Sequence, residues 1–374
     1  MAGLYVHIPF CRRKCHYCNF FSVASTRYLD AFFHSLPEEI YLRRNYLEGE
    51  TVRTIYLGGG TPSFVSPALI DKVLTSVRNY YPLTPDIEIT LEANPDDVTM
   101  PLLQQYKALG INRLSIGVQS FFDDDLQYLN RLHSAERAFQ SVVEAKEAGF
   151  ENISLDLIYG IPTLTDEKWE QNLEKAFSLE VPHISAYSLT VEPKTALDIL
   201  IRKKVLAEPM EEQSIEHFRI LQKKMKMHNF LHYEISNFCR DGYFSKHNSM
   251  YWTGEHYLGL GPSAHSYDGL SRQWNVGSLV QYIDQIARND RFYQREELTT
   301  IQKYNEYIMV SLRTMWGCDL GKIGREFGEG VAAGSRQSAV PFINSGDMIE
   351  KDKVLYLTDK GKLFADGIAS SLFL

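Results

Sequence analysis

Long apolar runs are absent from this chain of 374 residues. No stretch reaches the ~20 consecutive apolar residues that a helix needs to cross a bilayer. The first residues, MAGLYVHIPF, lack the charged start and apolar centre of a secretory signal, and they lack the Arg-rich composition of a transit peptide. We therefore expect a cytoplasmic protein without a membrane-spanning segment.

Positive charge is also scarce, because the formal net charge is −8 at pH 7. A general nucleic-acid binder normally carries a basic stripe, so we exclude nucleic acid as a partner. Glycine (24 residues) and proline (14 residues) are too few for a disordered chain, and the 44% of hydrophobic residues is ordinary for a globular protein. The length exceeds the ~250–300 residues at which single cores stop growing, which predicts two domains or one domain with an appendage.

Only five cysteines occur, and three of them lie within the segment CRRKCHYC. In a reducing compartment, thiols clustered this closely more often bind metal or do redox chemistry than form disulfides. An iron–sulfur cluster on Cys11, Cys15 and Cys18 would use all three thiolates and leave one iron open. Zinc is the alternative, with His7 or His16 as a fourth ligand, although the chain has no second Cys-x-x-Cys pair.

Short apolar segments alternate with helical patterns along the first half of the chain. Helix-like stretches such as SAERAFQSVVEAKEAGF, with Ser134 as its cap and Gly149 at its end, separate them. Six strands alternating with helices imply a parallel sheet or partial barrel of the α/β class, in which the loops after the strands meet at one face. The predicted strands begin at Leu4, Thr54, Ile87, Arg113, Asn152 and His183.

Polar or glycine-rich residues stand at the end of five predicted strands. Cys11 follows the first strand, Gly58–Thr61 end the second, Glu92 ends the third, Gln119 the fourth and Asp156 the fifth. Any one of them alone could cap a helix or form a turn. Their recurrence at successive strand ends predicts a single site at that end of the barrel.

The Cys-x-x-x-Cys-x-x-Cys motif after the first strand and the turn GGGTPS after the second resemble the radical S-adenosylmethionine (SAM) superfamily. This resemblance implies a partial (βα)6 barrel and a 4Fe-4S cluster on the three cysteines. It further implies that SAM chelates the open iron and is split to a 5′-deoxyadenosyl radical. Three thiolates hold such a cluster, and its fourth corner stays free for the cofactor.

The resemblance also implies a SAM pocket. The Gly59–Thr61 turn and Glu92 correspond to groups at the methionine amino end of SAM, and Arg131 to the arginine that pairs with its carboxylate. Gln119 and Asp156 are similar to residues that hold the ribose hydroxyls. Tyr5 matches a tyrosine of the family that lies close to the cluster and the cofactor. The residues implied to bind SAM are therefore Tyr5, Gly59, Gly60, Thr61, Glu92, Gln119, Arg131 and Asp156.

Nearly the whole chain resembles the coproporphyrinogen-oxidase-like group of this superfamily, through YVHIPFC, GVQSF, DLIYGIP, YEISNF, HNSMYW and GLGPSAHSY in that order. The oxygen-independent oxidases of that group have a longer N-terminal extension and a further cysteine, and Phe20 stands at the position of that cysteine. HNSMYW instead resembles the H-N-x-x-Y-W motif of HemW-type haem chaperones. We therefore expect a haem chaperone, with radical decarboxylation of coproporphyrinogen III propionates as the alternative.

Haem-binding candidates come from the same motif. His247 can ligate iron, and Tyr251 and Trp252 can stack on a macrocycle. His265 and Cys239 are competing ligands, although a structural thiol is the plainer interpretation of Cys239. The resemblance implies haem as cargo, haem-accepting proteins of unknown identity and a reductant such as flavodoxin or ferredoxin. Coproporphyrinogen III turnover is not expected, whereas SAM cleavage and a homodimer stay open.

The C-terminal sequence predicts a separable small unit. From Tyr304 it gives two helical stretches broken at Gly317, followed by a hairpin-like pair and a terminal helix, a winged-helix-like order. Because a basic recognition face is missing, we expect a scaffold or docking role. The predicted domains are a radical SAM core at residues 1–235 and an α+β domain at 236–374, whose part 296–374 is winged-helix-like.

Overall fold

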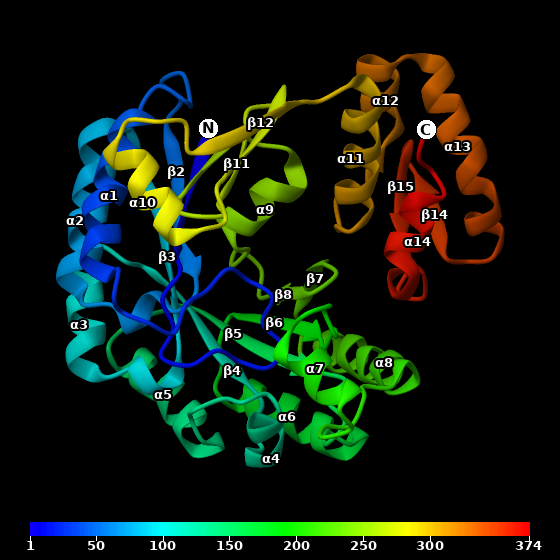
Figure 1. The fold of residues 1–374 in the computed structure, drawn as a ribbon. Coiled ribbons are helices and arrows are strands. Elements are labelled where there is room, and N and C mark those ends of the chain that lie inside the picture. Colours follow the sequence, from blue (N-terminus) through cyan, green and yellow to red (C-terminus); the bar gives the residue numbers. More distant parts are fainter.

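Six neighbouring parallel strands form the centre of a twelve-stranded sheet in the computed structural model, which describes residues 1–374. They pair in chain order, from β1 with β2 to β5 with β6. Their bounds are β1 (Ala2–Ile8), β2 (Val52–Gly59), β3 (Leu83–Ala93), β4 (Arg113–Gln119), β5 (Asn152–Tyr159) and β6 (His183–Ser188). The six predicted strands and their parallel arrangement are confirmed (Figure 1).

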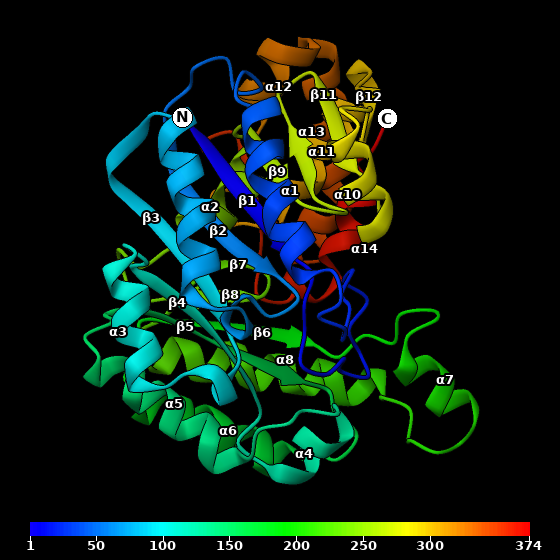
Figure 2. The ribbon, with the colours of Figure 1, turned by 60° about the vertical axis from the view of Figure 1, so that its left-hand side comes forward.

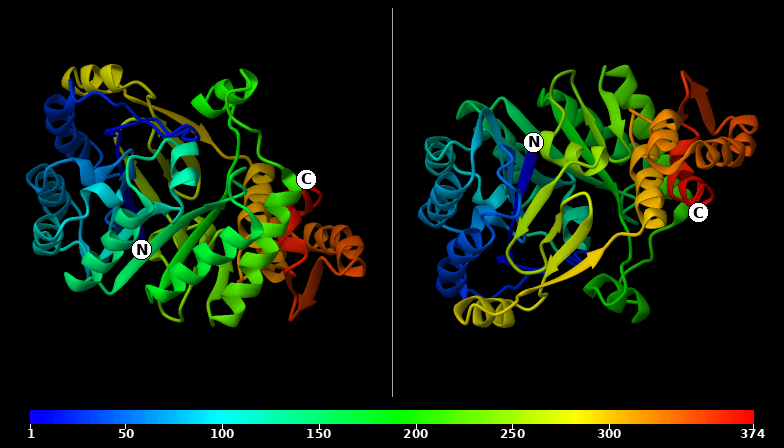
Figure 3. Two further views of the ribbon diagram at one scale, coloured as in Figure 1. Left: turned by 90° about the horizontal axis from the view of Figure 1, so that it is seen from below. Right: turned by 90° about the horizontal axis from the view of Figure 1, so that it is seen from above.

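Helices cover the outer face of these strands, because each connection between parallel strands must cross back over the sheet. Both views in Figure 3 show helices outside the curved sheet, and α1, α2 and α3 run beside β1–β3 in Figure 2. Ser134 caps α5 as predicted, since its side chain accepts from the Arg137 amide (3.2 Å). The helices are α1 (Leu29–Leu42), α2 (Pro67–Tyr80), α3 (Met100–Ala108), α4 (Asp123–Tyr128), α5 (Ala135–Glu147), α6 (Asp166–Ser178), α7 (Ala196–Arg202) and α8 (Glu211–Met227), with short 3-10 turns at Pro62–Phe64 and Pro95–Asp97.

Further strands extend the sheet on both sides. The hairpin of β7 (Leu231–Glu234) and β8 (Asn237–Cys239) follows β6, and β9 (Tyr257–Leu260) lies parallel to β1. Beyond β9 come β10 (His265–Tyr267), β11 (Ser271–Asn275) and β12 (Tyr293–Glu297), with α9 (Lys246–Thr253) and α10 (Leu279–Ala287) between strands. The domain boundary predicted near residue 235 falls between β7 and β8 of this one sheet, and it stays a prediction.

The last elements enclose a second, smaller core, which Figure 1 shows in orange and red beside β7 and α9. The predicted hairpin is confirmed, but α13 was not predicted, because its sequence EGVAAGSRQSAVPFIN is rich in small residues. Gly317 separates the first helices with a φ of +71°, and a Cβ there would lie 2.6 Å from the Leu355 carbonyl oxygen. The elements are α11 (Thr300–Leu312), β13 (Cys318–Asp319), α12 (Leu320–Phe327), α13 (Glu329–Asn344), β14 (Met348–Lys351), β15 (Val354–Leu357), a 3-10 turn at Gly361–Phe364 and α14 (Ala365–Ser370).

Main-chain hydrogen bonds join this C-terminal unit to the outer edge of β7. The Ile235 amide donates to the Arg313 carbonyl (3.1 Å), and the Met315 amide donates to the Tyr233 carbonyl (2.9 Å). The segment 313–315 therefore adds a short bridge to the large sheet. No helix in either part combines the length and the apolar character that crossing a membrane requires.

Candidate functional site

The loop between β1 and α1 carries the three predicted cysteines as free thiols. Neighbouring segments fix its backbone: the His16 amide donates to the Leu129 carbonyl (3.1 Å), and the Leu197 amide donates to the His16 carbonyl (2.8 Å). The Asn130 side chain donates to the Lys14 carbonyl (2.9 Å). The loop is thus held in place by residues after α4 and at the start of α7.

Two of the sulfurs accept hydrogen bonds from the ends of other elements. Thr61 Oγ1 donates to Cys11 Sγ (3.5 Å), and Arg131 Nη1 donates to Cys15 Sγ (3.3 Å). Asn94 joins the two donors, because its Oδ1 accepts from Arg131 Nη2 (2.5 Å) and its Nδ2 donates to Thr61 Oγ1 (3.2 Å). Sequence reasoning missed Asn94, although it follows Glu92 by two residues at the same strand end.

The electrostatics of the thiols favour a positively charged group among them. Burial raises the pKa of Cys11 and Cys18, and the charge of the neighbouring Cys15 thiolate raises both further. No three His, Cys, Asp or Glu side chains of the structure converge on a point where a single metal ion could sit. Cluster thiolates bind separate irons, so three thiols on one loop with hydrogen-bonded sulfurs are a donor set that fits a 4Fe-4S cluster.

Glu92 lies at the end of β3 and accepts two hydrogen bonds. The Tyr56 hydroxyl donates to its Oε1 (2.9 Å), and the Gly59 amide donates to its Oε2 (3.1 Å). Burial raises the pKa of Glu92 to about 7; the charge of Asp156 adds to this, and the two hydrogen bonds oppose it. This carboxylate therefore suits a cationic partner such as an ammonium group. Tyr56 is a second residue that sequence reasoning did not single out.

The GGGTPS turn needs glycine because its backbone runs close to β1. A Cβ at Gly59, whose φ is +111°, would lie 2.5 Å from the His7 ring. A Cβ at Gly60 would lie 2.7 Å from the Phe10 carbonyl oxygen. Glycine thus lets the end of β2 approach the start of the cysteine loop, and the predicted contact of this turn with SAM stays a prediction.

The remaining predicted SAM contacts gather at the same end of the sheet. Gln119 ends β4 at an irregularity in its pairing with β5 and has a φ of +70°, a strained value for a residue with a side chain. The side-chain nitrogen of Gln119, Nε2, and Arg131 Nη2 both lie beside Gly117. Asp156 on β5 accepts from the Ser115 hydroxyl (3.0 Å), and burial raises its pKa to about 6. The strained backbone of Gln119 is typical of a functional site.

The predicted haem-binding residues lie differently. His247 is 1% exposed, and both of its ring nitrogens are hydrogen bonded, Nδ1 with Thr54 Oγ1 (2.8 Å) and Nε2 with the Tyr251 hydroxyl (2.9 Å). Burial lowers its pKa to about 3. Neither nitrogen is free for iron in this conformation. Trp252 is partly exposed, with the Arg313 guanidinium 5.5 Å from its ring centre.

The two competing ligands differ in access. Cys239 is fully buried on β8, and burial raises the pKa of its thiol to about 12, as expected for a structural cysteine. His265 is exposed at the start of β10, with its ring stacked on Trp274 at a centroid distance of 6.2 Å. Among the three candidate iron ligands, only His265 presents an accessible side chain.

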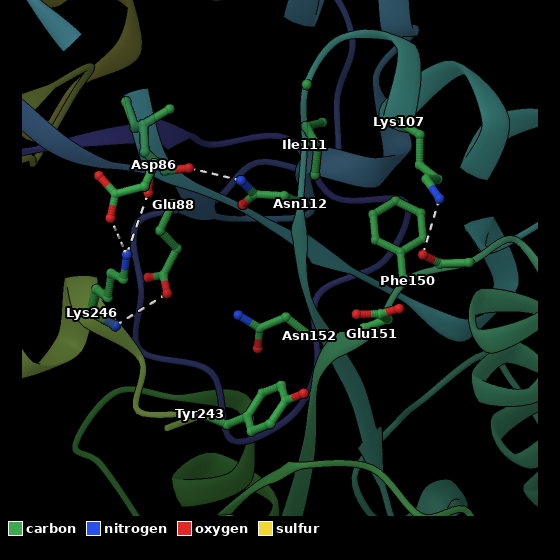
Figure 4. Close-up of a pocket in the computed structure, with 13 residues that line it drawn as sticks. Asp86, Glu88, Lys107, Ile111, Asn112, Phe150, Glu151, Asn152, Tyr243 and Lys246 are labelled. Atoms are coloured by element: carbon green, nitrogen blue, oxygen red, sulfur yellow. Dashed lines mark hydrogen bonds and ion pairs between the residues drawn. The ribbon is translucent and has the colours of Figure 1, made fainter. Parts of the chain in front are cut away.

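A separate pocket of about 500 Å³ opens at the opposite end of the strands, where β3, β4 and β5 begin. Both of its lysines already have partners: Lys246 Nζ lies 3.0 Å from Asp86 Oδ2, and Lys107 Nζ donates to the Gly149 carbonyl (3.0 Å) (Figure 4). Glu88, on the wall of this pocket, accepts from the Lys246 amide (3.2 Å). The pocket is therefore distinct from the site at the strand ends.

Comparison with known proteins shows the family of the chain. Residues 5–176 match the family model of the radical SAM superfamily. The heme chaperone HemW of Bacillus subtilis is 37% identical over 98% of both chains. The heme chaperone HemW of Lactococcus lactis is 33% identical over 96% of this chain and 93% of its own length.

The fold has a counterpart among solved structures. The coproporphyrinogen III oxidase HemN of Escherichia coli, described as a radical SAM enzyme, has a TM-score of 0.86 and covers 100% of this chain and 90% of its own. Its sequence identity is 24%, so this similarity concerns the fold alone. The large parallel sheet and the C-terminal region of helices with a small antiparallel sheet are thus features of a known architecture.

Proposed function

The chain belongs to the HemW family of the radical SAM superfamily, and on this basis we propose that it is a haem chaperone that binds haem, a 4Fe-4S cluster and SAM. It would transfer the haem to acceptor proteins. The observation that carries the proposal is the end-to-end similarity to relatives named heme chaperone HemW. Phe20 supports it, because it offers no thiol where the coproporphyrinogen oxidases are expected to have one.

The cluster is assigned to Cys11, Cys15 and Cys18. When bound, it supplies one electron to the sulfonium of SAM, after reduction by a donor such as flavodoxin or ferredoxin. Thr61 and Arg131 donate hydrogen bonds to two of the sulfurs, and the bond from Thr61 opposes the rise that burial causes in the pKa of Cys11. The main-chain hydrogen bonds that fix the loop would reduce the ordering cost of cluster binding.

SAM is assigned to the strand ends beside the cluster. Glu92, with the Gly59–Thr61 turn, would meet its ammonium group, and Arg131 would pair with its carboxylate through a planar guanidinium. Gln119 and Asp156 would accept from the ribose hydroxyls. Tyr5 lies on β1 with its hydroxyl 3.1 Å from His7 Nδ1, close to the start of the cysteine loop.

Haem is the proposed cargo, and its iron needs an accessible ligand. His265 is exposed, whereas His247 would have to lose its bond to Tyr251 before a nitrogen could reach iron. Trp252 offers a partly exposed ring against which a macrocycle can pack. We therefore favour His265 as the iron ligand. His265→Ala should shift or remove the Soret band of the haem-loaded protein, and retention of the band would exclude this assignment.

Anaerobic reconstitution of the wild-type protein tests the function. We expect about four irons per chain, a Soret band when haem is added, and no decarboxylation of coproporphyrinogen III with SAM and a reductant. Changing Cys11, Cys15 and Cys18 together to Ser should remove the iron chromophore. Propionate decarboxylation would support the oxidase alternative, and failure to take up haem would overturn the chaperone proposal.

A further inference from the structure

The H-N-x-x-Y-W helix, α9, is connected to the proposed SAM pocket through stacked aromatic rings. The His247 ring lies over the Tyr56 ring, with centroids 5.1 Å apart and planes inclined by 28°. The Tyr5 ring also stacks on Tyr56, with the two ring centroids 6.1 Å apart. The Tyr56 hydroxyl then donates to Glu92 Oε1 (2.9 Å). One ring thus separates His247 from the carboxylate assigned to SAM.

His247 is fixed more firmly than packing alone requires. Its two ring nitrogens bond to Thr54 on β2 and to Tyr251 one helical turn further along α9. Its backbone amide donates to Glu88 Oε1 (3.1 Å), so a carboxylate meets the amino end of α9, where the helix dipole favours negative charge. These contacts leave the imidazole with a single orientation against Tyr56.

Strand β3 connects both ends of this arrangement. Glu88 and Glu92 are four residues apart on the strand, so their side chains point to the same face of the sheet. Glu88 accepts a hydrogen bond from the first residue of α9. Glu92 is linked to the same helix through Tyr56, whose hydroxyl donates to Glu92 and whose ring stacks on His247. The same carboxylate-bearing face therefore anchors the helix and forms part of the proposed cofactor pocket.

We propose that His247 is a positioning residue of the SAM site: through Tyr56 it holds the Glu92 carboxylate toward the ammonium group of SAM. The inference rests on the proposed function only in requiring that SAM bind beside Glu92. It gives the histidine of the H-N-x-x-Y-W motif a role at the cofactor, while the haem iron takes its ligand elsewhere.

The pH dependence of SAM binding reports the charge on Glu92, and it would not change if His247 had a merely structural role. Tyr5 from β1, Tyr56 from β2, Asp156 from β5 and Tyr251 from α9 are the ionisable groups that face it. The Tyr56 hydroxyl stabilises the carboxylate, so its loss or displacement raises the pKa of Glu92. The form that binds an ammonium group would then appear only at higher pH, whereas general loosening would weaken SAM binding equally at every pH.

The experiment measures SAM binding by calorimetry on the full-length, cluster-loaded protein from pH 6 to 9. Tyr56→Phe removes one hydroxyl and keeps the ring, and His247→Phe keeps a ring but loses both side-chain hydrogen bonds. Thr54→Val keeps the imidazole and removes its Nδ1 partner, together with the hydrogen bond that Thr54 Oγ1 donates to Met250 Sδ (3.2 Å), so it decides the question if His247→Phe does not fold. The matched control is His217→Phe, because His217 is also fully buried and hydrogen bonded but lies on α8.

At neutral pH, Tyr56→Phe and His247→Phe should each weaken SAM binding about 10-fold, and Thr54→Val about threefold, with the pH of half-maximal affinity moved upward. His217→Phe should change neither. Wild-type affinity and pH dependence in the three test variants would overturn the inference, as would loss of the haem Soret band in His247→Phe with intact SAM binding. If the wild type binds SAM but no haem, the proposed function fails, while the SAM titrations still decide the role of His247.

Discussion

At the scale of single residues, the site gathers groups whose charged forms burial disfavours. The pKa values of Glu92 and Asp156 are raised to about 7 and about 6, and those of the Cys11 and Cys18 thiols are raised as well. Cationic partners reverse this effect, because they stabilise carboxylates and thiolates. Binding of iron and of an ammonium group at this end of the barrel should therefore release protons.

The free energy of unfolding of the cluster-free protein should depend on pH through the protonation of Glu92. Its folded-state pKa of about 7 lies above the ordinary value of 4.5, so the protonated form stabilises the folded state. That contribution is complete below about pH 4.5 and is lost as the pH rises through about 7. Between these limits, the wild type should lose up to about 3 kcal/mol of unfolding free energy relative to Glu92→Gln. Urea unfolding of both proteins at pH 5 and pH 8 measures the difference.

Parallel curves for the two proteins would contradict this assignment. Asp156 titrates in the same direction and is present in both proteins; because its charge also raises the pKa of Glu92, their interaction is part of the measured difference. A difference that grows toward acid pH instead of alkaline pH would mean that Glu92 is stabilised as a carboxylate in the folded state.

The sequence predicted residues at strand ends and missed those that act across elements. Glu92, Gln119 and Asp156 lie in the last part of three neighbouring parallel strands, so topology alone brings them to one end of the sheet. Tyr56 sits within β2, where an aromatic residue is ordinary, and its contact with Glu92 depends on the register of β2 and β3. The burial of His247 was equally invisible, because a motif does not say which face of its helix is covered.

At the scale of elements, the glycine-rich turn after β2 determines how closely β2 and the cysteine loop approach. Gly60→Ala should displace the loop, since the three atoms nearest to the new Cβ belong to the backbone, among them the Phe10 carbonyl oxygen at 2.7 Å. We expect a loss of about 1–3 kcal/mol in unfolding free energy and a lower iron content after reconstitution. Thermal unfolding and iron analysis measure both.

Gly334→Ala is the matched control for this change. Gly334 lies within α13, with no atom within 4 Å of an added Cβ, so alanine there should stabilise the protein by roughly 0.5–1 kcal/mol. Equal effects of the two substitutions would show that the turn tolerates a side chain.

Element prediction worked best where periodic apolar patterns were strong. The six parallel strands and the β14–β15 hairpin could be predicted because buried strands and turns leave local signals. α13 escaped because glycine and serine interrupt its pattern and Pro341 lies within it. The strands β9 to β12 are short, and tertiary pairing rather than local preference decides their conformation.

At the scale of the whole molecule, the C-terminal unit is attached through the backbone of residues 313–315. Met315→Pro removes the amide that donates to the Tyr233 carbonyl, whereas Met315→Ala retains it. The proline variant should lose about 1–3 kcal/mol at this junction, seen as faster amide exchange in β7 and in residues 300–374. Unchanged exchange in Met315→Pro, or the same increase in Met315→Ala, would mean that side-chain packing holds the unit.

The bridge at β7 also bears on how neighbouring molecules meet. An open sheet has two edges with unpaired peptide groups, and such edges can recruit other chains and start aggregation. Residues 313–315 cover part of the β7 edge, and the other edge, β12, carries the exposed charged sequence QREE at residues 294–297. Partial covering at β7 and exposed charge at β12 both disfavour hydrogen bonding between the sheet edges of neighbouring molecules. An open sheet with edges covered or charged in this way should resist the edge-to-edge pairing that starts fibril formation.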